Sequence, residues 1–420
     1  MAATTFALSE IKAFRTTSAA SDAQGLPAFS TPGYSCQRVA SGVMMPNIVE
    51  DMQASSEWDF KIFDATQLSP EDSLAAFIQK FNNQPFVVRF NSPSSQEKPL
   101  LFTTLLHGNE TSGLEALRRL VDNPPTPICD TYILVASVKA ASTAPMFFHR
   151  MLPGLPDLNR CFSPETLQQT QAALLSPDND STSSQAVQLH FSEPHLLAFR
   201  IWRFIMQLKP RWLIDLHNTS GASPAFTVVR HLTDNHVLLC QQFSPYIIRS
   251  NINMGAIFEL PTPFPCITVE CGGTGDELAN QTAFTGMHRL MMAPLADLQK
   301  DSEPAIILTD PIRLEVKASA NITLNYGNQA KKGADITLLE DIDRFNFASW
   351  EPGQSLGWAT ESGFSALTAV DEQGRERIDD ILELKNNSLQ CKTRLHLFMI
   401  TNRVDIALSD CLLYAVILRA

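Results

Sequence analysis

The sequence predicts an α/β fold in which a mixed sheet is flanked by helices and followed by a β-rich region. The first observation is that, between about 85 and 300, short apolar runs alternate with stretches of helical periodicity. These runs are almost continuously apolar, which is typical of strands covered by helices on both faces. The second observation is a change after about 300. Strand-like runs there are separated by Gly, Asn, Asp and Pro, and long helical periods are absent.

The individual elements follow from the same patterns. Helices are expected at 69–82, where Ser69 would cap the first turn, and at 111–122 and 193–208. Strands are expected at 85–90, 100–106, 131–138, 211–217, 225–230 and 266–271, and in the later runs AIILTD, RLEVKA, LHLFMIT and LLYAVILR.

The changes in composition and periodicity along the chain predict three regions. Residues 1–60 form an irregular lead-in, 61–300 form the α/β domain, and 301–420 form a β-rich domain. The span 163–192 is polar and is interpreted as a surface insertion or a lid.

Composition excludes several classes of protein. The chain has 420 residues, a formal net charge of −12 and no Lys/Arg-rich block. A protein that binds nucleic acid or an anionic membrane through its charge needs a basic face. Apolar runs are too short to cross a bilayer, and the first residues do not resemble a secretory signal. The eight cysteines are scattered without a CxxC pair, so reduced thiols and a cytoplasmic protein are expected, while homo-oligomerisation stays open.

Two motifs offer candidate metal ligands at the carboxyl ends of predicted strands. His107 and Glu110 follow one apolar strand across a turn that Gly108 permits, and His217 ends another. Ligands bind at this edge of open α/β sheets, and imidazole and carboxylate groups suit zinc. Asp215 would point to the same side of its strand as His217 and orient its ring. Taken singly, either motif is also explained as an incidental HxxE or as a strand-end histidine bonded to the backbone.

Further polar residues follow the same order along the chain. Glu270 comes after an apolar strand and before two glycines, where apolar walls would raise its pKa into the range useful for proton transfer. Asn159 and Arg160 are adjacent, and an arginine fork suits a substrate carboxylate. Arg150 is a second candidate cation. A solvent-exposed loop Glu and surface ion pairs are the alternatives for these residues.

The combined order resembles the zinc carboxypeptidase superfamily and, within it, the aspartoacylase and succinylglutamate desuccinylase family. The matching motifs are HGNE at 107–110 followed by TSG, DLNR at 157–160, DLHNT at 215–219 and VECGG at 269–273. The resemblance implies a carboxypeptidase-like mixed sheet with a C-terminal β domain. It also implies one Zn²⁺ per chain and hydrolysis of the amide bond of a small N-acyl amino acid.

The resemblance assigns roles residue by residue. It implies zinc ligation by His107, Glu110 and His217, catalysis by Glu270, carbonyl polarisation by Arg150, and substrate binding by Asn159, Arg160 and Asn218. Tyr246 and Tyr326 are the candidates for the family's substrate-binding tyrosine. The ECGG sequence after Glu270 departs from the family pattern and leaves the substrate open.

Two other functions compete with the deacylase interpretation. A zinc carboxypeptidase acting on short peptides needs an open cleft, whereas a metal-poor binding protein on the same fold needs neither ligands nor base. The β-rich domain is expected to pack against the α/β domain and narrow the mouth of the site, which favours small N-acyl amino acids.

Overall fold

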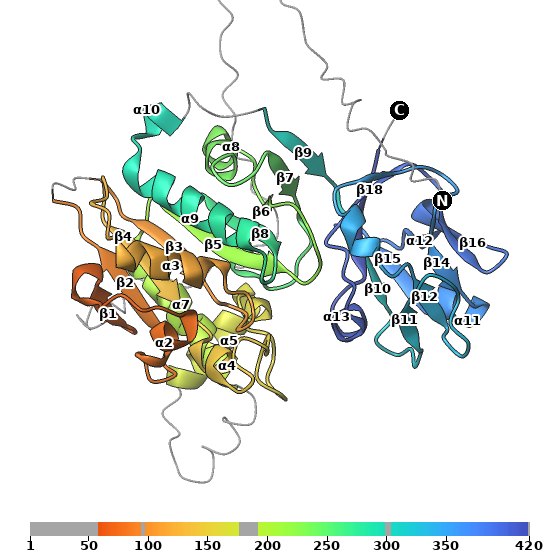
Figure 1. Cartoon of the computed structure of the whole chain (residues 1–420), viewed down its shortest axis with the longest axis horizontal. Coiled ribbons are helices and arrows are strands. Elements are labelled where there is room, and N and C mark those ends of the chain that lie inside the picture. Colours follow the sequence, from red (N-terminus) through yellow and green to blue (C-terminus); the bar gives the residue numbers. More distant parts are fainter. Residues whose placement is uncertain (1–57, 94–96, 176–191, 299–303, 419–420) are drawn as a thin grey trace, which may run out of the picture. The chain divides into compact units, whose positions relative to one another are not determined.

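The computed structural model describes residues 58–93, 97–175, 192–298 and 304–418 of the chain (Figure 1). All of these residues fall within one compact unit, Met45–Ala420. The predicted lead-in therefore lies almost wholly outside the described residues, as does most of the polar span 163–192. The first part of this polar span is described and forms α5 (Pro164–Leu175).

A mixed sheet of nine strands organises the first part of the described chain. Its order is β1-β2-β4-β3-β5-β8-β6-β7-β9, and the central strands β4, β3, β5 and β8 run parallel. The strands are β1 (Lys61–Asp64), β2 (Phe86–Phe90), β3 (Leu100–Thr104), β4 (Thr131–Val135), β5 (Trp212–Thr219), β6 (Phe226–Val229), β7 (Tyr246–Arg249), β8 (Cys266–Gly273) and β9 (Ile306–Thr309).

Helices cover both faces of this sheet, as the apolar strands predict. One face packs on α2 (Leu74–Gln79), α3 (Ser112–Asp122), α4 (Val138–Ser142), α8 (Asp234–Cys240) and α9 (Glu277–Met292). The opposite face packs on α5 and α7 (Glu193–Leu208). The short helix α10 (Leu295–Leu298) follows α9. In the central strands Leu101 and Leu213 face the α7 side, and Phe102 and Ile214 face the α3 side. This alternation is the two-residue period of a strand buried on both faces.

The last part of the described chain forms two further five-stranded sheets. Their orders are β13-β18-β19-β10-β15 and β11-β12-β14-β17-β16, and an apolar cluster joins them. The strands are β10 (Ile312–Val316), β11 (Leu324–Tyr326), β12 (Ile336–Leu338), β13 (Ser349–Trp350), β14 (Ser355–Ala359), β15 (Leu367–Val370), β16 (Leu382–Lys385), β17 (Ser388–Cys391), β18 (Leu395–Phe398) and β19 (Leu413–Ile417). The helices between them, α11 (Glu361–Ser365), α12 (Ile378–Ile381) and α13 (Val404–Ser409), are short, which confirms the prediction of a β-rich region.

Two predicted elements differ from the structure. The helix predicted at 69–82 is only α2, and its cap is Ser73, whose hydroxyl accepts the N–H of Ala76 at 3.2 Å. The run AIILTD forms β9, which pairs with β7 and so extends the nine-stranded sheet rather than the β-rich region. The predicted border at 300 therefore stays a prediction.

Two predictions from composition concern membranes and thiols. No helix in the described ranges is long and apolar enough to cross a membrane. Seven of the eight cysteines lie in these ranges, and all seven are buried free thiols, as predicted. Cys36 lies outside them.

Helix α3 follows the HGNE turn, and a glycine lets it approach the sheet closely. A Cβ on Gly113 would lie 2.3 Å from Thr104 Oγ1 and 3.0 Å from Leu216 Cβ. Gly113→Ala should therefore force α3 away from β3 and β5, and lower the free energy of unfolding by about 1–3 kcal/mol. Chemical denaturation measures this loss. Asp122→Ala is the control, because it removes only an exposed i,i+4 ion pair worth up to about 0.5 kcal/mol. Equal stability of the two variants would contradict the close packing.

Candidate metal centre

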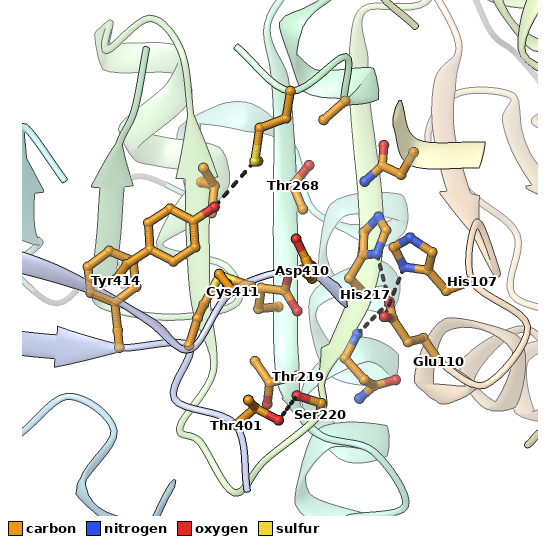
Figure 2. Close-up of a pocket in the computed structure, with 18 of the residues that line it drawn as sticks. His107, Glu110, His217, Thr219, Ser220, Thr268, Thr401, Asp410, Cys411 and Tyr414 are labelled. Atoms are coloured by element: carbon orange, nitrogen blue, oxygen red, sulfur yellow. Dashed lines mark hydrogen bonds and ion pairs between the residues drawn. The ribbon is translucent and has the colours of Figure 1, made fainter. Parts of the chain in front are cut away.

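Three buried side chains meet at the carboxyl ends of β3 and β5: His107, Glu110 and His217 (Figure 2). Glu110 bridges the two rings, with Oε1 2.9 Å from His107 Nδ1 and Oε2 2.7 Å from His217 Nδ1. The candidate ligand atoms all lie within 4.8 Å of one another. The structure thus brings together the three residues that the sequence predicts as ligands.

A tight turn after β3 places two of these side chains. Gly108 N–H donates to the carbonyl of Arg150 at 2.9 Å. A Cβ on Gly108 would lie 2.6 Å from Ala141 N and 2.7 Å from His149 O, so only glycine fits here. The same contact brings the segment that carries Arg150 against the turn.

Each histidine ring is oriented by a second carboxylate. His217 Nε2–H donates to Asp215 Oδ2 at 2.6 Å, and His107 Nε2–H donates to Asp157 Oδ1 at 2.9 Å. Asp215 is fully buried and also accepts the hydroxyl of Thr103 at 2.6 Å. These bonds fix the tautomer and direct both Nδ1 atoms toward Glu110. The prediction that Asp215 and His217 share one face of their strand is confirmed.

Charge inside the cluster is strongly coupled. Burial alone would lower the pKa of His217, but the carboxylates of Asp215 and Glu110 outweigh it and hold that pKa well above its usual value. Burial alone would raise the pKa of Glu110, but His107 and His217 hold it well below its usual range. The carboxylate therefore stays ionised between the two rings.

The donor set fits a divalent cation. His107 Nδ1 is buried, and its 2.9 Å contact with Glu110 Oε1 lacks hydrogen-bond geometry, so among the described residues this nitrogen has an ion-pair partner but no hydrogen bond. A buried nitrogen without a hydrogen bond is costly, and a metal ion would satisfy it. Two imidazoles and one carboxylate match zinc sites that leave a fourth position open.

Glu270 lies beside the cluster on the neighbouring strand, β8, where it pairs in register with His217. Its side chain is buried, and Oε2 has no hydrogen-bond partner within the described part of the chain. Burial raises the pKa of Glu270 to about 7, with a smaller opposing effect of His217. A carboxyl group in this state can both accept and donate a proton near neutral pH.

Arg150 reaches the cluster from the loop after α4. Its guanidinium donates to Glu110 Oε1 at 3.1 Å and to Asp157 Oδ2 at 3.0 Å. The alternative of a solvent-exposed surface pair does not describe this group, because both partners are buried or nearly so.

Asn159 and Arg160 lie in the short 3-10 helix η2 (Leu158–Arg160), which lines the same pocket. Asn159 Oδ1 accepts the N–H of Ile257 at 3.0 Å. Arg160 Nη2 lies 3.2 Å from Oδ1 of Asp410, and Nη1 donates to the carbonyl of Asn159 at 3.0 Å. The guanidinium predicted to bind a substrate carboxylate thus already has a carboxylate partner.

Asn218 also lines the pocket, but its amide is used within the protein. Its Oδ1 accepts the N–H of Ser112 at 3.0 Å, and its Nδ2 donates to Ser112 Oγ and to the carbonyl of Gly272. Its main-chain N–H donates to Glu110 Oε2 at 3.2 Å. These bonds join β5 to α3 and β8 directly behind Glu110.

Neither tyrosine singled out in the sequence lines the pocket, whereas Tyr414 does. Tyr326 instead donates to the carbonyl of Thr401 at 2.8 Å, and Tyr246 packs on Phe347. Tyr414 comes from β19, and its hydroxyl donates to Met254 Sδ at 3.3 Å (Figure 2).

Residues from the end of the chain complete the pocket, a cavity of about 100 Å³. They include Phe398, Met399, Thr401, Ile406, Asp410, Cys411 and Tyr414. The prediction that this region packs against the sheet that carries the candidate ligands is therefore confirmed. Sequence reasoning missed Asp157, Asp410 and Tyr414. Of these three residues, Asp157 could have been found from the sequence, because it is the first residue of the DLNR motif.

Fold and site together define an α/β protein with a buried candidate cation site of two histidines and one glutamate at the carboxyl edge of a mixed sheet. Residues 96–296 match the family model described as the succinylglutamate desuccinylase/aspartoacylase catalytic domain. This match spans just under half of the chain, and that part carries the three candidate ligands and Glu270. No curated protein matches the chain by sequence.

Solved structures of the same kind are similar to this chain at low identity. The succinylglutamate desuccinylase of Vibrio parahaemolyticus is 15% identical, and the match covers 79% of this chain and 86% of that one at a TM-score of 0.48. The succinylglutamate desuccinylase of Vibrio cholerae is 14% identical, with 83% and 94% covered and a TM-score of 0.48. The product-bound ectoine utilization protein EutE (DoeB) of Ruegeria pomeroyi is 13% identical, with 79% and 87% covered and a TM-score of 0.43.

The orienting role of Asp215 gives a test of the metal centre. Asp215→Asn should weaken zinc binding by about 10- to 100-fold, because the neutral amide no longer accepts the ring N–H with a full charge. Competition with a chromophoric chelator measures the affinity. Asp371→Asn is a matched control, since Asp371 is also a buried acid but pairs with Arg375 and Arg377. An unchanged affinity in Asp215→Asn would contradict the geometry described above.

Proposed function

We propose that this chain is a zinc-dependent amidohydrolase that cleaves the amide bond of small N-acyl amino acids. One observation carries the proposal: a two-histidine, one-glutamate candidate ligand set and Glu270 line one pocket, and Glu270 Oε2 has no hydrogen-bond partner among the described residues. The match to the succinylglutamate desuccinylase/aspartoacylase catalytic domain supports the same reaction class.

The proposed mechanism begins with the metal. His107, Glu110 and His217 would hold the zinc ion, which, when bound, activates a water molecule and polarises the amide carbonyl. Asp157 and Asp215 keep both rings in the tautomer that presents Nδ1. The protein thus supplies all three ligands from one buried cluster, with both rings already oriented.

Glu270 is proposed to move the proton. Its free Oε2 accepts a proton from the attacking water and returns it to the leaving nitrogen. The buried position of Glu270 favours this exchange, because the raised pKa makes the carboxyl group a usable acid as well as a base.

Arg150 is proposed to stabilise the negative charge that develops on the carbonyl oxygen. Its guanidinium contacts Glu110 at 3.1 Å, so its positive charge lies next to the ligand set. Asp157 holds it from the other side. A fixed cation costs no reorganisation when the charge appears.

Asn159 and Arg160 line the same pocket and are proposed to contact the substrate. For Asn218 the hydrogen bonds to Ser112 and Gly272 favour a positioning role, because they leave its amide engaged on both sides. Through its main-chain N–H it also supports Glu110.

The proposal for Glu270 predicts a clear separation of binding and catalysis. Glu270→Gln should lower kcat by about 10²-fold or more, since the amide cannot accept the proton. Zinc should stay bound at one ion per chain, because Glu270 lies outside the ligand set. Steady-state kinetics and metal analysis measure the two effects. Glu277→Gln, at an exposed acid on α9, is the control. Near-normal turnover in Glu270→Gln would remove this residue from the mechanism.

The enclosed pocket predicts a preference for small substrates. A cavity of about 100 Å³, partly walled by Phe398, Met399 and Tyr414, favours N-acetyl or N-succinyl amino acids over peptides. The test compares kcat/KM of the zinc-loaded protein on these compounds, on dipeptides and on longer peptides with blocked C-termini. Faster cleavage of the long peptides would favour a carboxypeptidase-like or endopeptidase function. Absence of both bound zinc and turnover would favour a binding protein.

A further inference from the structure

The carboxylate of Asp410 lies among three arginines in the part of the pocket that Arg150 and Arg160 line. Asp410 directly follows α13 and lies shortly before β19, separated from it by Cys411 and Leu412. It lines the pocket (Figure 2). Arg150 and Arg160 line the same pocket. The oxygens of Asp410 lie 2.7 Å from Arg313 Nη2, 3.2 Å from Arg160 Nη2 and 3.9 Å from Arg150 Nη2.

Arg313, not Arg160, anchors this carboxylate. Arg313 lies on β10, which pairs directly with β19. Its Nη2 donates both to Asp410 Oδ1 at 2.7 Å and to the main-chain oxygen of Asp410 at 2.8 Å. The contacts with Arg160 are longer, at 3.2 and 3.3 Å. Asp410 is therefore held as a fixed anion by its own sheet, and it does not depend on Arg160 for its position.

Both terminal nitrogens of Arg160 are already engaged by groups of the chain. Its Nη2 faces both oxygens of Asp410, and its Nη1 donates to the carbonyl of Asn159. A planar fork binds a carboxylate well when two N–H groups are free and parallel. Here the two terminal nitrogens are directed to groups of the chain itself.

The charges in this part of the pocket are already balanced by the chain. Arg150 is paired with Asp157, and Arg160 is paired with Asp410. A substrate carboxylate brought to Arg160 would lie beside the negative charge of Asp410. Like charges placed together in a partly desolvated site are strongly unfavourable.

Much of the remaining lining of the pocket is apolar. It includes Val228, Ile248, Met254, Phe258, Phe398 and Tyr414. The hydroxyl of Tyr414 is itself engaged with Met254 Sδ. Such a surface gains by burying an apolar group rather than a charged one.

We propose that Asp410 is a specificity-determining residue: it fills the carboxylate-binding position of Arg160, so that the part of the substrate reaching this part of the pocket is uncharged and apolar. The inference rests on the proposed amide hydrolysis and narrows its substrate class. It also changes the role that the sequence predicts for Arg160, from a reader of a substrate carboxylate to the partner of an internal one.

The test uses two matched pairs of substrates with wild-type protein and Asp410→Asn. One pair, N-acetyl-leucine and N-acetyl-leucinamide, differs in a carboxylate on the amine side. The other pair, N-succinyl-leucinamide and N-butyryl-leucinamide, differs in a carboxylate on the acyl side. For each pair, the measured quantity is kcat/KM of the acid divided by kcat/KM of its neutral partner. In the pair whose carboxylate reaches Arg160, Asp410→Asn should raise this ratio by about tenfold, mainly by lowering KM for the acid.

Two further variants separate charge from folding. Asp405→Asn removes an exposed acid on α13 that pairs with Arg403, and it should leave both ratios unchanged. Arg160→Lys should change the ratios little in the wild type but remove most of the gain in the Asp410→Asn background. Thermal melting checks that each variant is folded. If Asp410→Asn does not fold, Asp410→Glu replaces it, and its longer side chain should shift the ratios without a change of charge.

Binding measurements keep this inference distinct from the proposed function. Calorimetric titration of leucine against leucinamide and of succinate against butyramide needs no turnover, and Asp410→Asn should favour the acid of one pair by about tenfold. If this change in binding preference is observed but no amide is hydrolysed, the proposed reaction is wrong and the proposed role of Asp410 stands. The role of Asp410 would be overturned if the protein hydrolyses amides but Asp410→Asn leaves the preference between acid and neutral partner unchanged in both pairs. It would also be overturned if Asp410→Asn prefers the acid less than the wild type does.

Discussion

The bridge that Glu110 forms between His107 and His217 is the interaction on which the rest of the site depends. It joins a turn after β3 to the end of β5, so it exists only if these strands are neighbours in parallel register. The same register places Glu270 on β8 opposite His217. A slip of one residue in any of these strands would turn a functional side chain to the other face of the sheet. The apolar clusters on both faces oppose such a slip, because they fix which residues of each strand are buried on which side.

The parts of this arrangement that sequence could predict are local ones. The strands before His107, His217 and Glu270 are apolar runs that end in a polar residue, and parallel strands bring their carboxyl ends to one edge. Asp215 is predictable for the same reason, since it lies two residues before His217 on one strand. The cap of α2 was misjudged because Ser69 and Ser73 both precede apolar residues, and only tertiary packing selects the second.

The parts that sequence could not predict depend on contacts across long separations. Asp410 meets Arg160 across 250 residues, and neither residue lies in a pattern that indicates the other. Tyr414 lies on a strand whose alternation indicates only that some of its residues are buried. Strand β9 looks like the first strand of a new region, yet its pairing with β7 assigns it to the first sheet. The sequence of a short strand does not indicate which strand it will pair with. The domain border near residue 300 therefore cannot be derived from the residue pattern alone.

The carboxylates of Asp157 and Asp215 and the guanidinium of Arg150 act on the two histidines in opposite ways. Asp157 and Asp215 increase the basicity of His107 and His217, which strengthens binding of a cation but equally strengthens binding of a proton. Metal and proton therefore compete for the same Nδ1 atoms, and the competition favours the proton as the pH falls. Arg150 offsets part of this effect, because its charge lowers the proton affinity of His107 while it also neutralises Asp157. Arg150, which is proposed to stabilise the developing oxyanion, thus also lowers the affinity of His107 for a proton. For this reason its contact with Asp157 belongs to the chemistry of the metal centre as much as to that of the substrate.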